Sequence, residues 1–247
     1  MLMSKKSREK QKEISSKQKG ISRRKAIKVM FATAGLFAVS AGVSTLYENI
    51  HAPSFTEAFD NPFKRDRWLS NLESRPYANK KIATSEDLLE LKRNLDYTPP
   101  KDAFAAAIAE QEEIVGRGSK STLYIYETCF NNDFTPFKKG LGIIVENVIN
   151  NHELIHADHY FSGIPGYSIN LFKKTDGSFN IPLFMSISEI IAHRNEYEKL
   201  VESKHKDEFV LFYQSKIKDL AYPHFQIIYH LTKDSEILKK VEREKWF

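Results

Sequence analysis

The sequence contains a single cysteine, Cys129, among its 247 residues. An internal disulfide is therefore excluded, and packing or a bound metal must stabilise the fold. The sequence also has no glycine-rich phosphate loop, no serine nucleophile elbow and no internal repeat, so it lacks the signals of nucleotide binding, of serine hydrolases and of solenoids. Its main apolar run, residues 29–43, is short for a membrane span of about 20 residues. A protein with many membrane spans is thus excluded.

The composition is typical of a soluble globular domain with an appendage, because 41% of the residues are hydrophobic and 28% are charged. The formal charge of +5 comes from one end of the chain. Residues 1–28 hold 11 Lys or Arg against 2 Asp or Glu, which leaves 26 basic and 30 acidic residues elsewhere. Since the basic excess is confined to a terminal segment, charge does not indicate nucleic-acid binding.

The basic segment ends in Ser22-Arg23-Arg24-Lys25-Ala26-Ile27-Lys28, which resembles the twin-arginine export motif. The apolar run 29–43 follows it, and Val39-Ser40-Ala41 offers small residues for cleavage by a signal peptidase. The resemblance implies the twin-arginine export machinery as a partner and a periplasmic or other extracytoplasmic location. An uncleaved N-terminal membrane anchor is the alternative, and it leads to the same side of the membrane.

The strongest chemical signal is the stretch 151–160, which contains His152-Glu153-Leu154-Ile155-His156 and, further on, His159. On a helix, His152 and His156 lie one turn apart on one face, and Glu153 projects to the side. Two imidazoles at this spacing suit adjacent corners of a zinc site, where the glutamate reaches the water held by the metal. A surface helix with ordinary polar histidines is the alternative.

This H-E-x-x-H stretch resembles the active-site helix of the zincin metallopeptidases. The positions that follow His156 do not fit the metzincin branch, because His159 and Ser162 replace its glycine and its third histidine. The gluzincin pattern fits better, with a glutamate on a later helix as third ligand. Asp158 departs from the extended zincin pattern, which usually has an apolar residue there.

Glu189 is the first candidate for that third ligand, because Glu189-Ile190-Ile191-Ala192 resembles the gluzincin ligand helix. Glu196 and His159 are the alternatives, in that order. His193 is a candidate to orient a ligand or to stabilise the oxyanion. Three tyrosines are further candidates for the oxyanion or the substrate: Tyr160, Tyr167 and Tyr197.

The resemblance implies a zinc-dependent hydrolase that cleaves a peptide or amide bond, with Glu153 as general base and Zn²⁺ held by His152, His156 and Glu189. A carboxylate-bridged di-iron oxidase is one alternative, although its usual E-x-x-H pair occurs only once, from Glu153 to His156. A non-catalytic extracytoplasmic binding protein is the other.

We expect an α+β fold, mainly α and zincin-like, with a small sheet, a β-hairpin and a C-terminal helical part. Three segments follow from composition: 1–47 as the basic region and signal or anchor, 48–100 as a linker and docking arm, and 101–247 as the metallohydrolase domain. The periodicities predict the following elements: a helical Ala-rich segment at 100–115, a strand at 121–128, a helix at 141–161, a hairpin at 167–184 around Asp176-Gly177, a helix at 188–198, and a helix that starts at Pro223.

Overall fold

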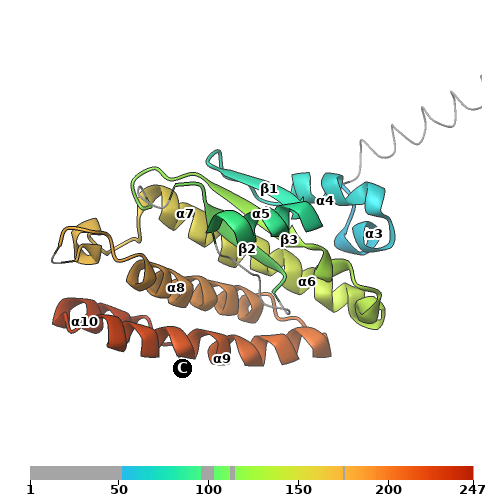
Figure 1. Ribbon diagram of the computed structural model, residues 1–247. Helices are drawn as coiled ribbons and strands as arrows, with labels where there is room; N and C mark the ends of the chain where they lie inside the picture. Colours follow the sequence, from blue (N-terminus) through green and yellow to red (C-terminus); the bar gives the residue numbers. More distant parts are fainter. Residues whose placement is uncertain (1–51, 96–102, 112–114, 175, 247) are drawn as a thin grey trace, which may run out of the picture. The chain divides into compact units, whose positions relative to one another are not determined.

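A mixed three-stranded sheet lies on one side of a set of long helices in the computed structural model, which describes residues 52–95, 103–111, 115–174 and 176–246 (Figure 1). Its strands are β1 (Ala78–Ala83), β2 (Ala105–Ala109) and β3 (Ser121–Tyr126). β3 is central, parallel to β1 and antiparallel to β2. β2 is therefore an edge strand within the described sheet, and its outer backbone groups are free to meet other elements.

A helical rod runs beneath the sheet and carries the H-E-x-x-H residues. It consists of α6 (Lys138–Val148), a single π-helical segment (Ile149–Glu153) and α7 (Leu154–Ser162), which together confirm the predicted helix at 141–161. Apolar side chains of the rod, such as Ile144, Leu154 and Ala157, are fully buried. The π-segment coincides with His152 and Glu153, and such bulges are frequent at functional sites.

Further helices form the layers below the rod, as Figure 1 shows. α8 (Ile181–Glu202) packs against the π-segment and α7, and it includes the predicted helix at 188–198. α9 (Glu208–Leu231) packs along α8, and α10 (Ser235–Arg243) joins α9 at the C-terminal end. The histidines of the rod therefore face the middle helix of the stack.

The segment that precedes the sheet belongs to the same unit, which extends from Pro53 onward. α3 (Phe55–Asp60) packs against α6, α4 (Arg65–Asn71) packs against α3 and β1, and the two helices bury Phe55 and Trp68. α5 (Ser85–Leu95) follows β1. Gly142 permits the close approach of α3, since a Cβ added there would lie 2.8 Å from the Phe55 ring. Short 3₁₀ turns complete the fold at Pro62–Lys64, Glu127–Phe130, Asn132–Phe137 and Ile169–Phe172.

The Ala-rich segment was wrongly predicted to be helical. Residues 105–109 form β2, although alanine is the best helix former. The reason is tertiary, because the segment pairs with β3 in register from Ala105 opposite Ile125 to Ala109 opposite Ser121. Small side chains also let this strand approach the rod closely.

Two further expectations about local structure were wrong. The turn at Asp176-Gly177 exists, with Gly177 at φ 82°, but only one isolated bridge, Lys173 to Phe179, flanks it instead of a hairpin. Asn180 caps α8 with its side chain and Pro182 lies in the first turn, so the apolar residues after the turn enter a helix. Pro223 lies inside α9 instead of starting a helix.

Both the twin-arginine motif and the apolar run 29–43 fall outside the described residues. Among the helices of the described part, none has the length and apolar character that crossing a membrane requires.

Candidate metal centre

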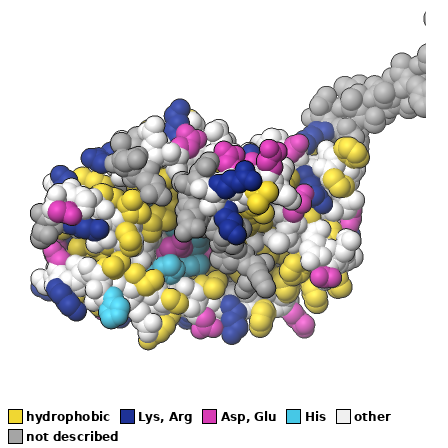
Figure 2. All heavy atoms as spheres, viewed as in Figure 1, with side chains coloured by type: hydrophobic (Ala, Val, Ile, Leu, Met, Phe, Trp, Pro, Cys, Tyr) yellow, Lys and Arg dark blue, Asp and Glu magenta, His cyan; other side chains and the backbone are white. Residues whose placement is uncertain are grey.

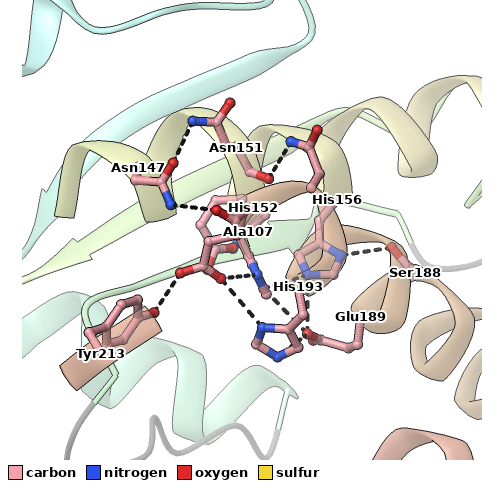
Figure 3. A network of polar contacts seen from close by, with 12 residues as sticks. Ala107, Asn147, Asn151, His152, His156, Ser188, Glu189, His193 and Tyr213 are labelled. Atoms are coloured by element: carbon pink, nitrogen blue, oxygen red, sulfur yellow. Dashed lines mark hydrogen bonds and ion pairs between the residues drawn. The ribbon is translucent and has the colours of Figure 1, made fainter. Parts of the chain in front are cut away.

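Hydrogen bonds from asparagine side chains connect the rod, near its π-segment, to α8. Asn147 donates to the carbonyl of Glu196 at 3.1 Å, and its own side-chain oxygen accepts from Asn151 at 2.8 Å. Asn195 of α8 donates to the carbonyl of Asn151 at 2.8 Å. These bonds join backbone and side-chain groups of the two helices just above the histidines (Figure 3). They hold the π-segment at a fixed distance from α8.

Three donor atoms converge between the two helices. The Nε2 atoms of His152 and His156 lie 3.1 Å apart, and Glu189 Oε2 lies 3.3 Å from the first and 3.4 Å from the second. Ligands at about 2.0–2.1 Å around a tetrahedral zinc are about 3.3 Å from one another. The triangle therefore has the dimensions of one face of a tetrahedral metal site, and imidazole and carboxylate are suitable ligands for a divalent metal ion.

Each of the two H-E-x-x-H imidazoles is oriented through its other nitrogen. His152 Nδ1 donates to Glu196 Oε2 at 3.0 Å, and His156 Nδ1 lies 2.7 Å from Ser188 Oγ. Because the carboxylate can only accept, the proton of neutral His152 is on Nδ1 and Nε2 is left with a lone pair. Such partners are typical of histidines that bind metals.

Ser188 is shared between two histidines, since His159 Nδ1 is also 2.7 Å from its hydroxyl oxygen. Burial lowers the pKa of His159 to about 3, so this imidazole is neutral and can accept. Ser188 then donates to His159 and accepts from His156 Nδ1. When His156 is neutral, this arrangement places its lone pair on Nε2, where a metal ion could accept it.

The buried charges of the centre depend on one another. Burial by itself would raise the pKa of Glu196, but its hydrogen bonds with His152 and His193 outweigh burial and lower the pKa to about 2. For His152, burial opposes the charge, yet contacts with Glu189 and Glu196 raise the pKa well above its ordinary value. Burial also acts against the charge of Glu189, whose pKa is nevertheless lowered by His156 and His152. In the metal-free protein, protonated imidazole thus supplies the positive charge that these carboxylates need.

Glu153 reaches from the rod to the edge strand β2. Its Oε2 accepts from the backbone N–H of Ala107 in β2 at 2.6 Å. Tyr160 donates to the carbonyl of the same alanine at 3.2 Å, and its ring lies nearly parallel to that of His156. Burial raises the pKa of Glu153, although nearby imidazoles oppose the rise. A carboxylate with a raised pKa suits proton transfer near neutral pH.

A cavity of about 460 Å³ opens beside these groups. One wall is β2 with the residues before it, and the other is formed by α8 and α9, including Met185, Tyr213 and Leu220. Figure 2 shows histidine and acidic side chains in a hollow near the middle of this face, with hydrophobic side chains beside them. The centre is thus accessible from outside through a largely apolar opening.

The structure brings together most of the predicted site residues. His152, Glu153, His156, Glu189, His193 and Glu196 all line the cavity together with Tyr160. Glu196 serves as a hydrogen-bond acceptor for His152, and His159 lies behind Ser188. Two of the three tyrosines lie elsewhere, with Tyr167 packed beside Phe172 and Tyr197 beside Trp246.

Three groups at the centre were not predicted from the sequence: Ser188, Tyr213 and the backbone of Ala107. Tyr213 donates to Glu196 Oε1 at 2.6 Å from α9, which lies in the segment expected only to be a C-terminal helical part. Ser188 directly precedes Glu189, which is the one signal that could have indicated it. Asp158, the departure from the zincin pattern, faces Arg75 at 2.9 Å and Tyr77 at 2.6 Å on the far side of α7.

Comparison of the chain with protein-family models, with curated proteins and with solved structures finds no match.

Proposed function

We propose that this protein is a zinc-dependent hydrolase, and more specifically a metallopeptidase of the zincin type. The observation that supports it best is the triangle of His152, His156 and Glu189, whose edges of 3.1–3.4 Å suit one tetrahedral ion. Glu153 lines the same cavity, which is where a general base must lie. The order of these residues on two successive helices is also what the gluzincin resemblance implies.

Glu153 and the backbone N–H of Ala107 have separate roles in the proposed reaction. Zinc, when bound, would lower the pKa of a water molecule to about 7 and polarise the carbonyl of the substrate. Glu153 would accept a proton from water on its carboxylate as the water oxygen adds to the substrate carbonyl, and would pass that proton to the nitrogen as the C–N bond breaks. The bond from Ala107 N–H holds Oε2 of Glu153 in place, which leaves Oε1 for the proton.

The open edge of β2 suits a peptide substrate. Phe104 and Glu110 pair with β3 through their backbones, whereas the N–H and the carbonyl of Ala107 face the cavity. By the alternation of a strand, the backbone groups of Ala105 and Ala109 face the same way. Because Glu153 and Tyr160 already bond the backbone of Ala107, an extended peptide can pair with Ala105 and Ala109 on either side of it and so pass across the cavity.

The arrangement favours this reaction over the di-iron alternative. A di-iron site needs several carboxylates as ligands, but Glu153 is bonded to β2 and both oxygens of Glu196 accept hydrogen bonds from His152, His193 and Tyr213. Glu189 differs from the other two because its Oε2 faces the Nε2 atoms of His152, His156 and His193.

Metal content and hydrolysis measured on three variants test the proposal. The purified protein should hold about one zinc and cleave generic peptides. Glu153→Gln should keep the metal and lose hydrolysis, whereas His156→Ala should lose both. Glu198→Gln, a change on the exposed face of α8, is the matched control and should keep both. Metal retained in full by His156→Ala would refute the assignment, as would hydrolysis by Glu153→Gln at the rate of the parent protein.

A further inference from the structure

The imidazole of His193 is oriented by a hydrogen-bond partner at its Nδ1 atom, as are the two imidazoles of the H-E-x-x-H stretch. It lies one turn after Glu189 on α8, and only 8% of its surface is exposed. Its Nδ1 lies 3.4 Å from Glu196 Oε2, the oxygen that also accepts from His152 Nδ1 at 3.0 Å. One buried carboxylate oxygen therefore orients two imidazoles. A histidine whose Nδ1 is held in this way presents Nε2 for another purpose.

The Nε2 atom of His193 points toward the same oxygen as the other two. It lies 3.8 Å from Glu189 Oε2, compared with 3.3 Å for His152 and 3.4 Å for His156. His152, Glu189 and His193 each offer a donor atom, and these atoms all lie within 4.8 Å of one another. Figure 3 shows the His193 ring beside Glu189, on the side away from Ser188.

We propose that His193 is a fourth protein ligand of the metal, so that the centre is held by three histidines and one glutamate. The inference rests on the proposed function for the presence of a metal at this place, and it adds a ligand from α8 that the H-E-x-x-H pattern does not contain. Four protein ligands are typical of closed zinc sites, and three are typical of catalytic ones. His193 would then control how readily water and substrate reach the ion.

The edge from His193 Nε2 to Glu189 Oε2, at 3.8 Å, exceeds the ideal tetrahedral edge by about half an ångström, and the donor atoms of His152, Glu189 and His193 lie within 4.8 Å of one another, so His193 must move toward the ion to complete the tetrahedron. The bond from His193 to Glu196 is also the longer of the two, so this imidazole is held less tightly than His152. His193 would then be a ligand that can give way to water or substrate.

Cobalt(II) substitution followed by proton NMR tests the fourth ligand in the unaltered protein. Each imidazole that binds cobalt through Nε2 carries an exchangeable Nδ1 proton, whose resonance the paramagnetic ion shifts far from the normal range. We expect three such resonances, from His152, His156 and His193. If only two such resonances appeared, the inference about His193 would be overturned and the zinc site itself would stand. If the protein bound no cobalt and showed none of these resonances, both proposals would be overturned.

Cobalt affinity and the visible spectrum of two variants give an independent measurement. Removal of an outer-shell partner commonly costs 10–100-fold in affinity, so His193→Gln, which removes a ligand, should weaken binding at least tenfold and change the visible bands. His224→Gln is the matched control. His224 is a neighbouring histidine on α9, and its ring centre lies 6.2 Å from that of His193. This control should bind cobalt like the parent. If His193→Gln kept both the affinity and the spectrum but lost hydrolysis, His193 would act on the substrate and not on the metal.

Discussion

The buried carboxylate of Glu196 should be a large contributor to the stability of the metal-free protein. It is 1% exposed, and it accepts from His152, His193 and Tyr213. Lowering its pKa from 4.5 to about 2 corresponds to about 3 kcal/mol of folding free energy at neutral pH. Glu196→Gln keeps the shape but removes the charge, and it also points an N–H₂ group at a hydrogen-bond donor. We therefore expect a loss of about 3 kcal/mol, which is roughly 6–12 °C in Tm for a unit of this size.

The pH dependence of that loss has a definite sign. A carboxylate with a lowered pKa in the folded state stabilises the fold fully above the pKa of the unfolded chain, near 4.5, and the contribution disappears as the pH falls toward about 2. The difference between the parent protein and Glu196→Gln should therefore be constant from pH 7 to about 5 and shrink below 4.5.

Urea denaturation in the presence of a chelator measures this difference at each pH. Glu198→Gln, two residues further along α8 and exposed, is the matched control and should change the unfolding free energy by less than about 0.5 kcal/mol. Equal stability of the parent and Glu196→Gln at pH 7 would refute the reasoning. A difference that stays the same down to pH 3 would show that charge is not its cause.

Three further predictions address the support of the centre, the packing of the rod and export. Ser188→Ala should weaken zinc binding about 10–100-fold because His156 loses the partner of its Nδ1, whereas Ser186→Ala on the same helix should not, as competition with a chelator would show. Gly142→Ala should destabilise by about 1–3 kcal/mol in thermal denaturation, since its Cβ would lie 2.8 Å from Phe55. Changing Arg23 and Arg24 to lysine should abolish export in cell fractionation if the twin-arginine route is used; unchanged export would refute that route.

The local signals of the rod and of α8 were strong enough to predict the core of the site. The spacing of four between His152 and His156, and the apolar period around them, placed both imidazoles on one buried face. Glu189 was found because a short pattern marked the later helix, and the structure places its carboxylate between the imidazoles. The apolar periodicity therefore predicted the two helices and the residues on the sides where they face each other.

Contacts between segments far apart in the sequence were not predictable in this way. Ala105–Ala109 has the composition of a helix and becomes a strand only because β3 lies beside it. Tyr213 reaches Glu196 from α9, which local sequence marked only as an amphipathic helix. The π-segment has no recognised sequence signal either. It is supported by Asn147, Asn151 and Asn195, whose amides bond across to the neighbouring helix.

The balance of charge connects the fold to the proposed chemistry. Glu189 and Glu196 have lowered pKa values and so bring two negative charges to the centre. Their neighbours there include the imidazoles of His152, His156 and His193. Buried charges without compensation are costly, and the raised pKa of His152 shows which imidazole holds a proton in the metal-free protein. A divalent cation with three neutral imidazoles would balance the two carboxylates completely. Zinc should then release the proton of His152 as it binds, and Glu153, whose pKa burial raises, would remain able to exchange a proton with substrate.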